Sequence, residues 1–395
     1  MLALRQILAA LDAKRDRFSS AEKVFRQDLE TLAQTMEQMS AMSREEIEVH
    51  LAEYQNPGAR PTAEHQKNTN IIIPFAEKWS NHSQARDWAM GILHGVPTLA
   101  TDGSQISPSK DVSIPVGVVQ VGWFENRHQP DGSYVKDIQV EVLAPDELSS
   151  DDTPESVFPD WHINWRRFKL EVDLLTDYMN AKAGVKPKPL CFFDGSLIVS
   201  FTEQMRPDRQ QLYTDAVRRL LETSEKTGIP LVGYVDTSYA NDLVVMLGHV
   251  FNLNLSGRVS DVRAMEGARM LRLRMNWGDR SQAFICARDD RVSNRYYEQV
   301  CFIYLKTTAD SPPARIEFPR WIYETGEHER VFDLVRAECV VGIGYPYSLE
   351  TADAVAVLTM QDRDKFYRLF QRFAKKEELP LRFSRKETSK RGRRV

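Results

Sequence analysis

Several features that identify common protein classes are missing from this chain, and each missing feature excludes a class. Only four of the 395 residues are cysteines and none forms a C-x-x-C pair, which argues against a zinc site or a disulfide scaffold and favours a reduced, intracellular protein. No run of 18 apolar residues occurs, and the charged N-terminal segment lacks the uninterrupted apolar core of a signal peptide. We therefore expect a soluble, cytoplasmic protein without a membrane span.

The motifs of several familiar enzymes are missing as well. The chain has no G-x-x-x-x-G-K-[ST] sequence, so it does not hydrolyse ATP through a P-loop, and it has no G-x-S-x-G nucleophile elbow. Its eight histidines are scattered, and none lies beside a serine or cysteine in a recognisable nucleophile motif. The net charge of −4 excludes a basic coat over the whole molecule, although a local basic patch remains open.

Residues 1–60 form a predicted N-terminal helical extension. Apolar residues recur there at helical spacing, namely Val24, Phe25, Leu29, Leu32, Met36 and Met39. This stripe needs a cover, which is either the extension's own domain or, as in a coiled coil, a partner helix. Pro, Gly and Asn within residues 55–70 predict a linker. Residues 61–380 then form the main domain, and the Arg- and Lys-rich residues 381–395 form a disordered basic tail.

The main domain mixes strands and helices. Residues 112–126 and 133–144 alternate like two antiparallel strands, and the apolar runs that begin at Leu190 and Ile229 read as further strands. Residues 163–183 and 348–376 have the pattern of helices. Antiparallel strands followed by alternating strands and helices predict an α/β fold, with a mixed β-sheet flanked by helices.

The tripeptide D-G-S occurs twice, as Asp102-Gly103-Ser104 and as Asp194-Gly195-Ser196. About a tenth of one such tripeptide is expected by chance in a chain of this length, and each copy follows a short apolar run. Because glycine lets the backbone leave a strand sharply, we expect both aspartates at strand ends, facing a cleft. The alternative is that both are exposed turn residues.

Other acids could converge on this pair. Glu171 and Asp177 lie in the predicted helix 163–183, Asp236 ends an apolar run, and Asp353 lies among Ala and Val. Carboxylates without a Cys/His set suit a hard cation, Mn²⁺ or Mg²⁺. Two such ions roughly 3.5–4 Å apart can clamp the attacking and leaving oxygens of a phosphodiester displacement. An ion would also offset the cost of placing acids at the ends of buried strands.

Four segments, taken in order over roughly residues 90–370, resemble the NurA nuclease family: the two D-G-S strands, RIEFPRWI at 315–322 and GYPYSLETADAVAVL at 344–358. The resemblance implies a ribonuclease-H-like core with the first D-G-S on its opening strand. It implies Mn²⁺-dependent cleavage of DNA, commonly as 5′-to-3′ resection of DNA ends during double-strand break repair. It also implies a homodimer that docks on the hexameric DNA translocase HerA.

The same resemblance assigns roles to particular residues. Asp102 and Asp194 match the two strand aspartates that hold metal, and Glu171 best matches the helix glutamate, with Asp177 as its rival. Asp353 stands where family members tend to have a histidine, and we interpret it as a fourth catalytic metal ligand. Asp236 stands where many archaeal members have a lysine, so any charge-stabilising role at that strand is in doubt.

Binding of DNA needs cations, and the sequence offers candidates without ranking them. Arg166, Arg167 and the basic tail are predicted phosphate contacts, and Arg320 is either a phosphate contact or half of a structural ion pair. Two alternatives to a DNA nuclease stay open. One is a ribonuclease-H-like nuclease that acts on RNA, and the other is a non-catalytic adaptor with the same fold that binds DNA or the translocase.

Overall fold

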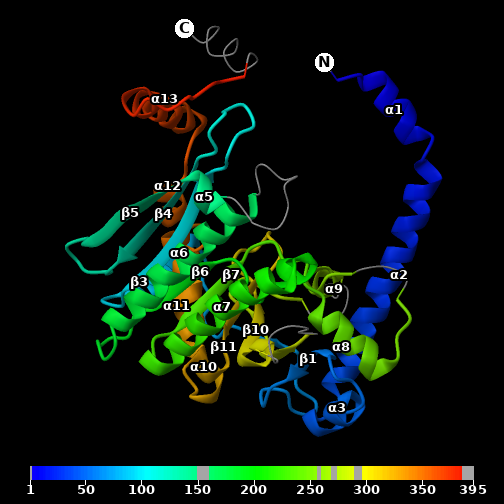
Figure 1. The fold of residues 1–395 in the computed structure, drawn as a ribbon. Helices are drawn as coiled ribbons and strands as arrows, with labels where there is room; N and C mark the ends of the chain where they lie inside the picture. Colours follow the sequence, from blue (N-terminus) through cyan, green and yellow to red (C-terminus); the bar gives the residue numbers. More distant parts are fainter. Residues whose placement is uncertain (1, 149–159, 256–258, 268–273, 289–295, 385–395) are drawn as a thin grey trace. The chain divides into compact units, whose positions relative to one another are not determined.

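The computed structural model describes residues 2–148, 160–255, 259–267, 274–288 and 296–384 (Figure 1). The chain folds into two compact units. Unit 1 consists of Met1–Ala85, Ser196–Ile198 and Gly233–His328, and unit 2 consists of Arg86–Gly195, Val199–Val232 and Glu329–Val395. None of the described helices is both long and apolar enough to cross a membrane.

The sheet of unit 2 carries the strand order β7-β6-β3-β4-β5. Its strands are β3 (Thr98–Ile106), β4 (Gly117–Asn126), β5 (Tyr134–Leu143), β6 (Leu190–Asp194) and β7 (Leu231–Val235), of which β7 contributes its first two residues to this unit. β3, β4 and β5 pair antiparallel, whereas β6 runs parallel to β3. The predicted antiparallel pair and the mixed α/β fold are confirmed, while the ribonuclease-H-like classification stays a prediction.

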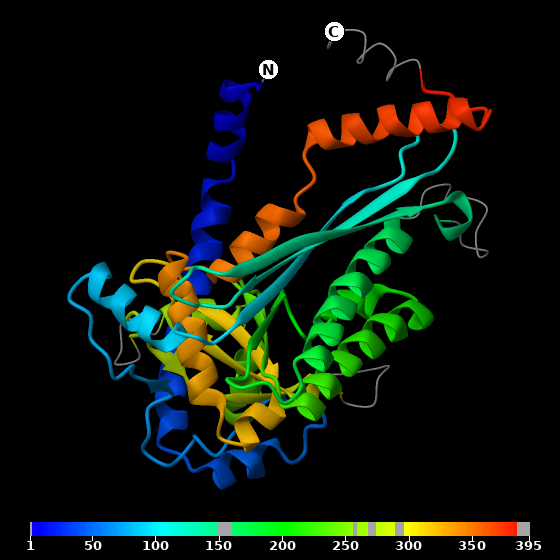
Figure 2. The same cartoon turned by 90° about the vertical axis from the view of Figure 1, so that its left-hand side faces the viewer.

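Helices cover both faces of this sheet (Figure 2). The helices of unit 2 are α4 (His82–Leu93), α5 (Pro145–Leu148), α6 (Asp160–Ala181), α7 (Pro207–Thr227), α11 (His328–Val341), α12 (Tyr347–Ala356) and α13 (Met360–Lys376), with a 3-10 turn, η1 (Ser200–Gln204). A Cβ at Gly117 would lie 2.8 Å from Ile163 of α6, and a Cβ at Gly122 would lie 2.9 Å from the Ala356 backbone of α12. Since residues 117 and 122 face opposite sides of β4, α6 and α12 pack on opposite faces.

Unit 1 holds a second group of strands in the order β1-β9-β10-β11-β7. The strands are β1 (Gly58–Pro61), β2 (Ile72–Ile73), β8 (Arg280–Ser281), β9 (Phe284–Ala287), β10 (Val300–Leu305) and β11 (Ala314–Pro319). The helices are α1 (Leu4–Asp12), α2 (Arg15–Ser40), α3 (Arg44–Leu51), α8 (Asp242–Phe251), α9 (Asp261–Gly267) and α10 (Arg320–Glu324), with the 3-10 turn η3 (Tyr296–Gln299). The predicted N-terminal helices are therefore present.

The apolar stripe of α2 is covered along only part of its length. Leu32, Met36 and Met39 are buried in unit 1, where α2 contacts α8 and α9, whereas Val24 is 42 % exposed. The C-terminal half of α2 therefore packs on its own unit, which was one of the two predicted covers.

The linker predicted at residues 55–70 is wrong, because this segment contains β1, which pairs with β9. Gly58 has a φ of +84°, and a Cβ there would lie 2.6 Å from the Asp242 carbonyl oxygen. A glycine is thus needed at position 58 because β1 approaches α8 closely there. It does not mark a flexible linker. The compact units also divide the chain differently from the predicted domains 1–60, 61–380 and 381–395.

Two boundaries near the C-terminus also differ from prediction. The single helix predicted over 348–376 is two helices, because Thr359 starts α13 with a capping box in which Thr359 and Asp362 bond each other's backbone N–H. The predicted basic tail begins too early, since Phe383 pairs with Val112 and Leu381 packs beside Tyr367. Residues 385–395 lie outside the described part of the chain.

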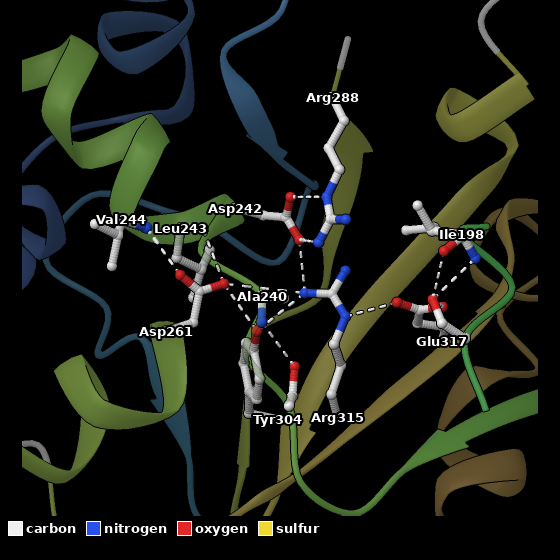
Figure 3. A network of polar contacts seen from close by, with 12 residues as sticks. Ile198, Ala240, Asp242, Leu243, Val244, Asp261, Arg288, Tyr304, Arg315 and Glu317 are labelled. Atoms are coloured by element: carbon white, nitrogen blue, oxygen red, sulfur yellow. Dashed lines mark hydrogen bonds and ion pairs between the residues drawn. The ribbon is translucent and has the colours of Figure 1, made fainter. Parts of the chain in front are cut away.

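A buried charge network organises unit 1 around Arg315 of β11 (Figure 3). The Arg315 Nη1 atom lies 2.7 Å from Asp242 Oδ2, and its Nε atom lies 2.7 Å from Glu317 Oε1. Tyr304 donates a 2.8 Å hydrogen bond to Asp261 Oδ2. Arg315 is 1 % exposed, so its charge is stable there only because the carboxylates surround it.

The same network holds a short stretch of chain that follows the second D-G-S aspartate. Glu317 Oε2 accepts hydrogen bonds from Ser196 Oγ at 2.8 Å and from the Leu197 backbone N–H at 2.7 Å. Glu317 is the glutamate of the E-F-P sequence, so this motif fastens Ser196–Ile198 to β11 within unit 1 (Figure 3).

Arg315→Met should lower the free energy of unfolding by about 3–5 kcal/mol, because it removes the buried cation that pairs with Glu317 and leaves Asp242 paired, among the described residues, with Arg288 alone. Arg320→Met, five residues away, is the matched control. Arg320 forms an exposed ion pair with Glu324 in the next turn, so its loss should cost less than about 1 kcal/mol. Urea denaturation of both variants measures the difference, and equal costs would contradict a structural role for the network.

Candidate carboxylate site

The two D-G-S segments lie side by side in unit 2. Parallel pairing of β3 with β6 aligns Thr101 with Phe193, so the next residues, Asp102 and Asp194, occupy neighbouring positions on adjacent strands. Adjacent strands are about 4.8 Å apart, and aligned residues point to the same face. The register therefore brings the two aspartates together, as the sequence predicts.

The first D-G-S does not end its strand, which corrects one part of the prediction. β3 continues to Ile106, and Asp102, Gly103 and Ser104 all pair with β4. Gly103 is needed for a different reason: a Cβ there would collide with Glu171 Oε1 and would lie 2.7 Å from Arg167 Cγ. Its missing side chain thus lets the carboxylate of α6 reach β3.

The second D-G-S behaves as expected. Asp194 is the last residue of β6, and Gly195 has a φ of +118°, a conformation that residues with a side chain rarely adopt. The Tyr345 hydroxyl donates a 3.1 Å hydrogen bond to Asp194 Oδ1. Tyr345, the first tyrosine of the G-Y-P-Y sequence, therefore orients Asp194, a role that the sequence did not reveal.

Asp353 reaches this region from α12, which is fastened near both ends. At its C-terminal end, Ser104 and Gln120 donate hydrogen bonds from their side chains to the Ala356 carbonyl oxygen. At its N-terminal end, the Ser348 backbone N–H and hydroxyl donate to Glu338 Oε2 at 2.9 and 2.7 Å. These contacts fix the helix turn that carries Asp353 against β3 and β4.

Glu338 itself is a fully buried carboxylate that sequence analysis missed. Thr98 of β3 donates a 2.7 Å hydrogen bond to its Oε1 atom, and His128 Nε2 lies 3.4 Å from the same oxygen. Burial alone would raise the pKa of Glu338, but these partners and the Ser348 backbone lower it on balance. Glu338 thus remains charged and joins the start of β3 to the start of α12. No motif in the sequence marks it.

Burial and the charges of neighbouring acids raise the pKa values of Asp102 and Asp194. Burial, followed by the charges of Asp194 and Asp353, raises the pKa of Asp102 to about 6, against an opposing hydrogen bond from the Gly103 backbone. The Asp194 side chain is exposed at the end of β6, but lost hydration of its carboxylate and the charge of Asp353 raise its pKa, while the Tyr345 hydrogen bond opposes this. Neighbouring carboxylates that repel in this way bind protons or cations.

Glu171 of α6 lies over Gly103, on the other face of β3 from the Asp102 side chain. Its side chain is 3 % exposed, and burial raises its pKa to about 8, although the nearby Arg167 charge opposes the shift. The charges of Asp102 and Asp194 raise this pKa further. Asp177, the rival helix acid, is exposed and has no part in these interactions among the described residues. Of the two α6 acids, Glu171 is therefore the one whose charge is coupled to the aspartates, and its role as a metal ligand stays a prediction.

The three arginines predicted to contact DNA are paired with acids, and Asp236 belongs to a different unit from the other aspartates. The closest nitrogen–oxygen distances are 2.5 Å from Arg166 to Glu141, 2.7 Å from Arg167 to Glu171, and 2.7 Å from Arg320 to Glu324. Each predicted DNA-binding arginine is thus paired with a carboxylate, and its role in phosphate contact stays a prediction. Asp236 follows the end of β7, is exposed, and belongs to unit 1.

The donor set fits a hard divalent cation, because oxygen ligands without cysteine or histidine suit Mn²⁺ or Mg²⁺. Among the described residues, no three of Asp102, Glu171, Asp194 and Asp353 bring one oxygen each within 4.8 Å of one another. Ligands around one such ion, at about 2.1 Å from it, lie within about 4.2 Å of one another. No three of these described acids thus bring their oxygens close enough for the shell of one ion, and the two-ion arrangement stays a prediction.

Comparison with known proteins places this site in a family. The model of the NurA domain matches residues 96–358, which is more than half of the chain and includes all four acids. The chain belongs to the NurA family. Proteins of this family are nucleases. No curated protein matches the chain significantly.

Several NurA crystal structures are similar to this chain. One described as NurA with manganese has 10 % sequence identity and a TM-score of 0.45, covering 70 % of this chain and 89 % of that one. A second NurA structure has 11 % identity, a TM-score of 0.40 and the same coverage. A third, NurA bound to dAMP and manganese, has 10 % identity and a TM-score of 0.35, covering 68 % of this chain and 86 % of that one.

In this NurA-family chain, Gly103→Ala should destabilise the fold by about 1–3 kcal/mol, because the new methyl group overlaps the Glu171 carboxylate. In a Glu171→Ala background the same change should cost less, since the overlap with Glu171 Oε1 is gone and only the flexible Arg167 side chain must move. Gly195→Ala is the control, because its cost comes from its φ of +118° and should not change in that background. A double-mutant cycle by urea denaturation measures the coupling, and purely additive effects would contradict the proposed contact.

The raised pKa of Glu171 predicts an unusual pH dependence for the metal-free NurA-family protein. Between about pH 5 and pH 8 the folded state keeps a proton on Glu171 that the unfolded state releases, so stability falls as pH rises, by up to about 1.4 kcal/mol per pH unit. Glu171→Gln removes this contribution. The stability of the variant relative to the parent, measured in EDTA, should therefore increase from pH 5 to pH 8. A constant difference across this range would contradict the assignment.

Proposed function

We propose that this chain is a divalent-metal-dependent nuclease that hydrolyses the phosphodiester bonds of DNA. The observation that carries the proposal is the convergence of Asp102, Asp194 and Asp353 from distant parts of the chain, where burial and the charge of Asp353 raise the pKa of both other aspartates. Burial raises the pKa of Glu171, which is also near enough for Asp102 and Asp194 to raise it further. Such a group is costly without a cation. Membership of a nuclease family supports phosphodiester hydrolysis as the use of that cation.

In the proposed site, Asp102, Asp194 and Asp353 hold Mn²⁺ or Mg²⁺, with Glu171 as the fourth ligand. Such ions supply the charge that offsets the phosphate and the lowered pKa of bound water that phosphodiester hydrolysis requires. The protein provides geometry: the β3–β6 register sets the two strand aspartates, and Tyr345 orients Asp194.

Arg167 has a supporting role in this proposal. Its guanidinium group lies 2.7 Å from Glu171 Oε1 and 3.3 Å from the Gly103 carbonyl oxygen. In the absence of an ion, it supplies the nearest positive charge to the most buried acid. It also holds Glu171 over Gly103, in reach of the strand that carries Asp102.

The finer parts of the proposal concern substrate and partners. We propose DNA-end resection in repair, with the motor supplied by a separate HerA-type hexameric translocase and with the nuclease as a homodimer. The lack of a P-loop sequence supports a separate motor, since processive resection needs ATP hydrolysis. If the purified protein and such a translocase elute separately from size-exclusion chromatography, the partnership is wrong, although the nuclease proposal stands.

Asp194→Asn should reduce Mn²⁺-dependent cleavage of DNA by at least ~10²-fold, the scale of losing one electrostatic catalytic element, with an unchanged fold. Asp177→Asn is the matched control, because this exposed acid of α6 lies apart from the cluster. It should cleave at nearly the parental rate. Labelled DNA with Mn²⁺, with and without EDTA, provides the assay.

Parental activity in Asp194→Asn would remove this residue from the site. A parent protein that binds no Mn²⁺ by calorimetry and cleaves neither DNA nor RNA would favour the adaptor alternative. Preferential cleavage of RNA ends in a competition assay would favour the ribonuclease alternative, because the carboxylate chemistry is the same for both polymers.

A further inference from the structure

Helix α13 carries a cationic groove that the carboxylate site does not use. Arg368, Arg372 and Lys375 follow one another at helical spacing and line a groove of roughly 510 Å³, together with Gln371. Leu379 and Leu381, from the segment after the helix, form part of its wall. No acidic residue lines the groove. Three cations without an acid in one hollow predict a site for an anion.

The groove is preformed, because both of its walls are fixed. Tyr367, on the apolar side of α13, is buried against Ile106 and Val118 of β3 and β4. The segment after α13 is bonded to the loop before β4, where the Ser113 N–H donates to the Arg382 carbonyl oxygen at 2.9 Å and the Ser384 N–H donates to that of Asp111 at 2.8 Å. A ligand would therefore meet these cations without ordering the backbone first.

The three groove cations differ from their neighbours on the helix. Lys365 forms an ion pair with Asp362, and Lys376 forms one with Glu377. Within the residues that the structure describes, no ion pair involves Arg368, Arg372 or Lys375, and all three are exposed. Their charge is available to a partner.

The spacing of the cations fits a polymer of phosphates. Seven residues separate Arg368 from Lys375, which corresponds to about 10 Å along a helix. One DNA strand places a phosphate every 3.4 Å along its axis, so roughly three phosphates span the same length. The groove has no aromatic side chain on which a single base could stack, which favours contact with the backbone over recognition of a nucleotide.

We propose that the α13 groove is a second DNA-binding surface. It binds the phosphate backbone of the substrate at a place separate from the carboxylate site. This proposal rests on the proposed function, since it takes DNA as the substrate. α13 begins four residues after the end of α12, the helix of Asp353, and both belong to unit 2. The sequence beyond Ser384 adds further Arg and Lys, which increases the positive charge of the same stretch of chain.

The test is the triple variant Arg368→Gln, Arg372→Gln, Lys375→Gln, compared with a control of equal charge change, Arg5→Gln, Arg17→Gln, Lys23→Gln, on α1 and α2. Fluorescence anisotropy with a labelled 30-base-pair duplex in EDTA measures binding without cleavage. The groove variant should bind at least about tenfold more weakly, and the slope of log K against log salt should fall by about 2–3 units, near 0.9 per lost phosphate contact. The control should match the parent.

Kinetics with Mn²⁺ separate this proposal from the proposed function. In the groove variant, KM for DNA should rise while kcat stays within about threefold of the parent.

An unchanged salt slope and affinity would overturn the groove proposal even if the parent cleaves DNA. If the variant instead loses affinity for poly-glutamate and keeps its affinity for DNA, the groove serves an acidic protein and the proposal is also wrong. Failure of the parent to cleave DNA would contradict only the proposed function, because the binding assay does not need cleavage.

Discussion

The parallel pairing of β3 with β6 is the constraint on which the rest of the site depends. Its register, with Thr101 opposite Phe193, sets Asp102 beside Asp194. A shift by one residue would turn one aspartate to the other face of the sheet. Glu171 and Asp353 then approach from the helices on opposite faces, α6 and α12, so four segments far apart in the sequence contribute one carboxylate each.

Bringing these acids together costs free energy, and the surrounding residues reduce this cost only in part. Arg167 pairs with Glu171, and Tyr345 donates a hydrogen bond to Asp194. The pKa values of Asp102 and Glu171 still rise to about 6 and about 8. Glu338 differs, because its hydrogen bonds keep its pKa low. Glu338 is thus a structural carboxylate with a lowered pKa, whereas Asp102 and Glu171 have raised pKa values because their surroundings do not fully stabilise a negative charge. A raised pKa of this kind is expected of metal ligands in the metal-free protein.

The sequence predicted the meeting of the acids because a repeated tripeptide after an apolar run is a local signal. The prediction that the strand ends before Gly103 was wrong. In a sequence, a glycine that makes room for a side chain from a helix cannot be distinguished from a glycine that makes a turn. The linker predicted at residues 55–70 was wrong for a similar reason, because Gly58 allows close packing on α8. Glu338 and the pairing of Arg166 with Glu141 could not be predicted, because they depend on contacts between distant segments. Glu324, only four residues from Arg320, is a local partner that helical spacing could have indicated. The Thr359 capping box was visible in the sequence but lay inside a longer helical pattern.

We propose that these four carboxylates hold divalent ions. A crystal structure of the protein grown with Mn²⁺, with anomalous diffraction recorded at the manganese edge, tests it most directly. We expect anomalous peaks at about 2.1 Å from oxygens of Asp102 and Asp194, with Asp353 or Glu171 completing the shells. Manganese bound only elsewhere, with Asp102 and Asp194 free of metal at saturating concentration, would contradict it.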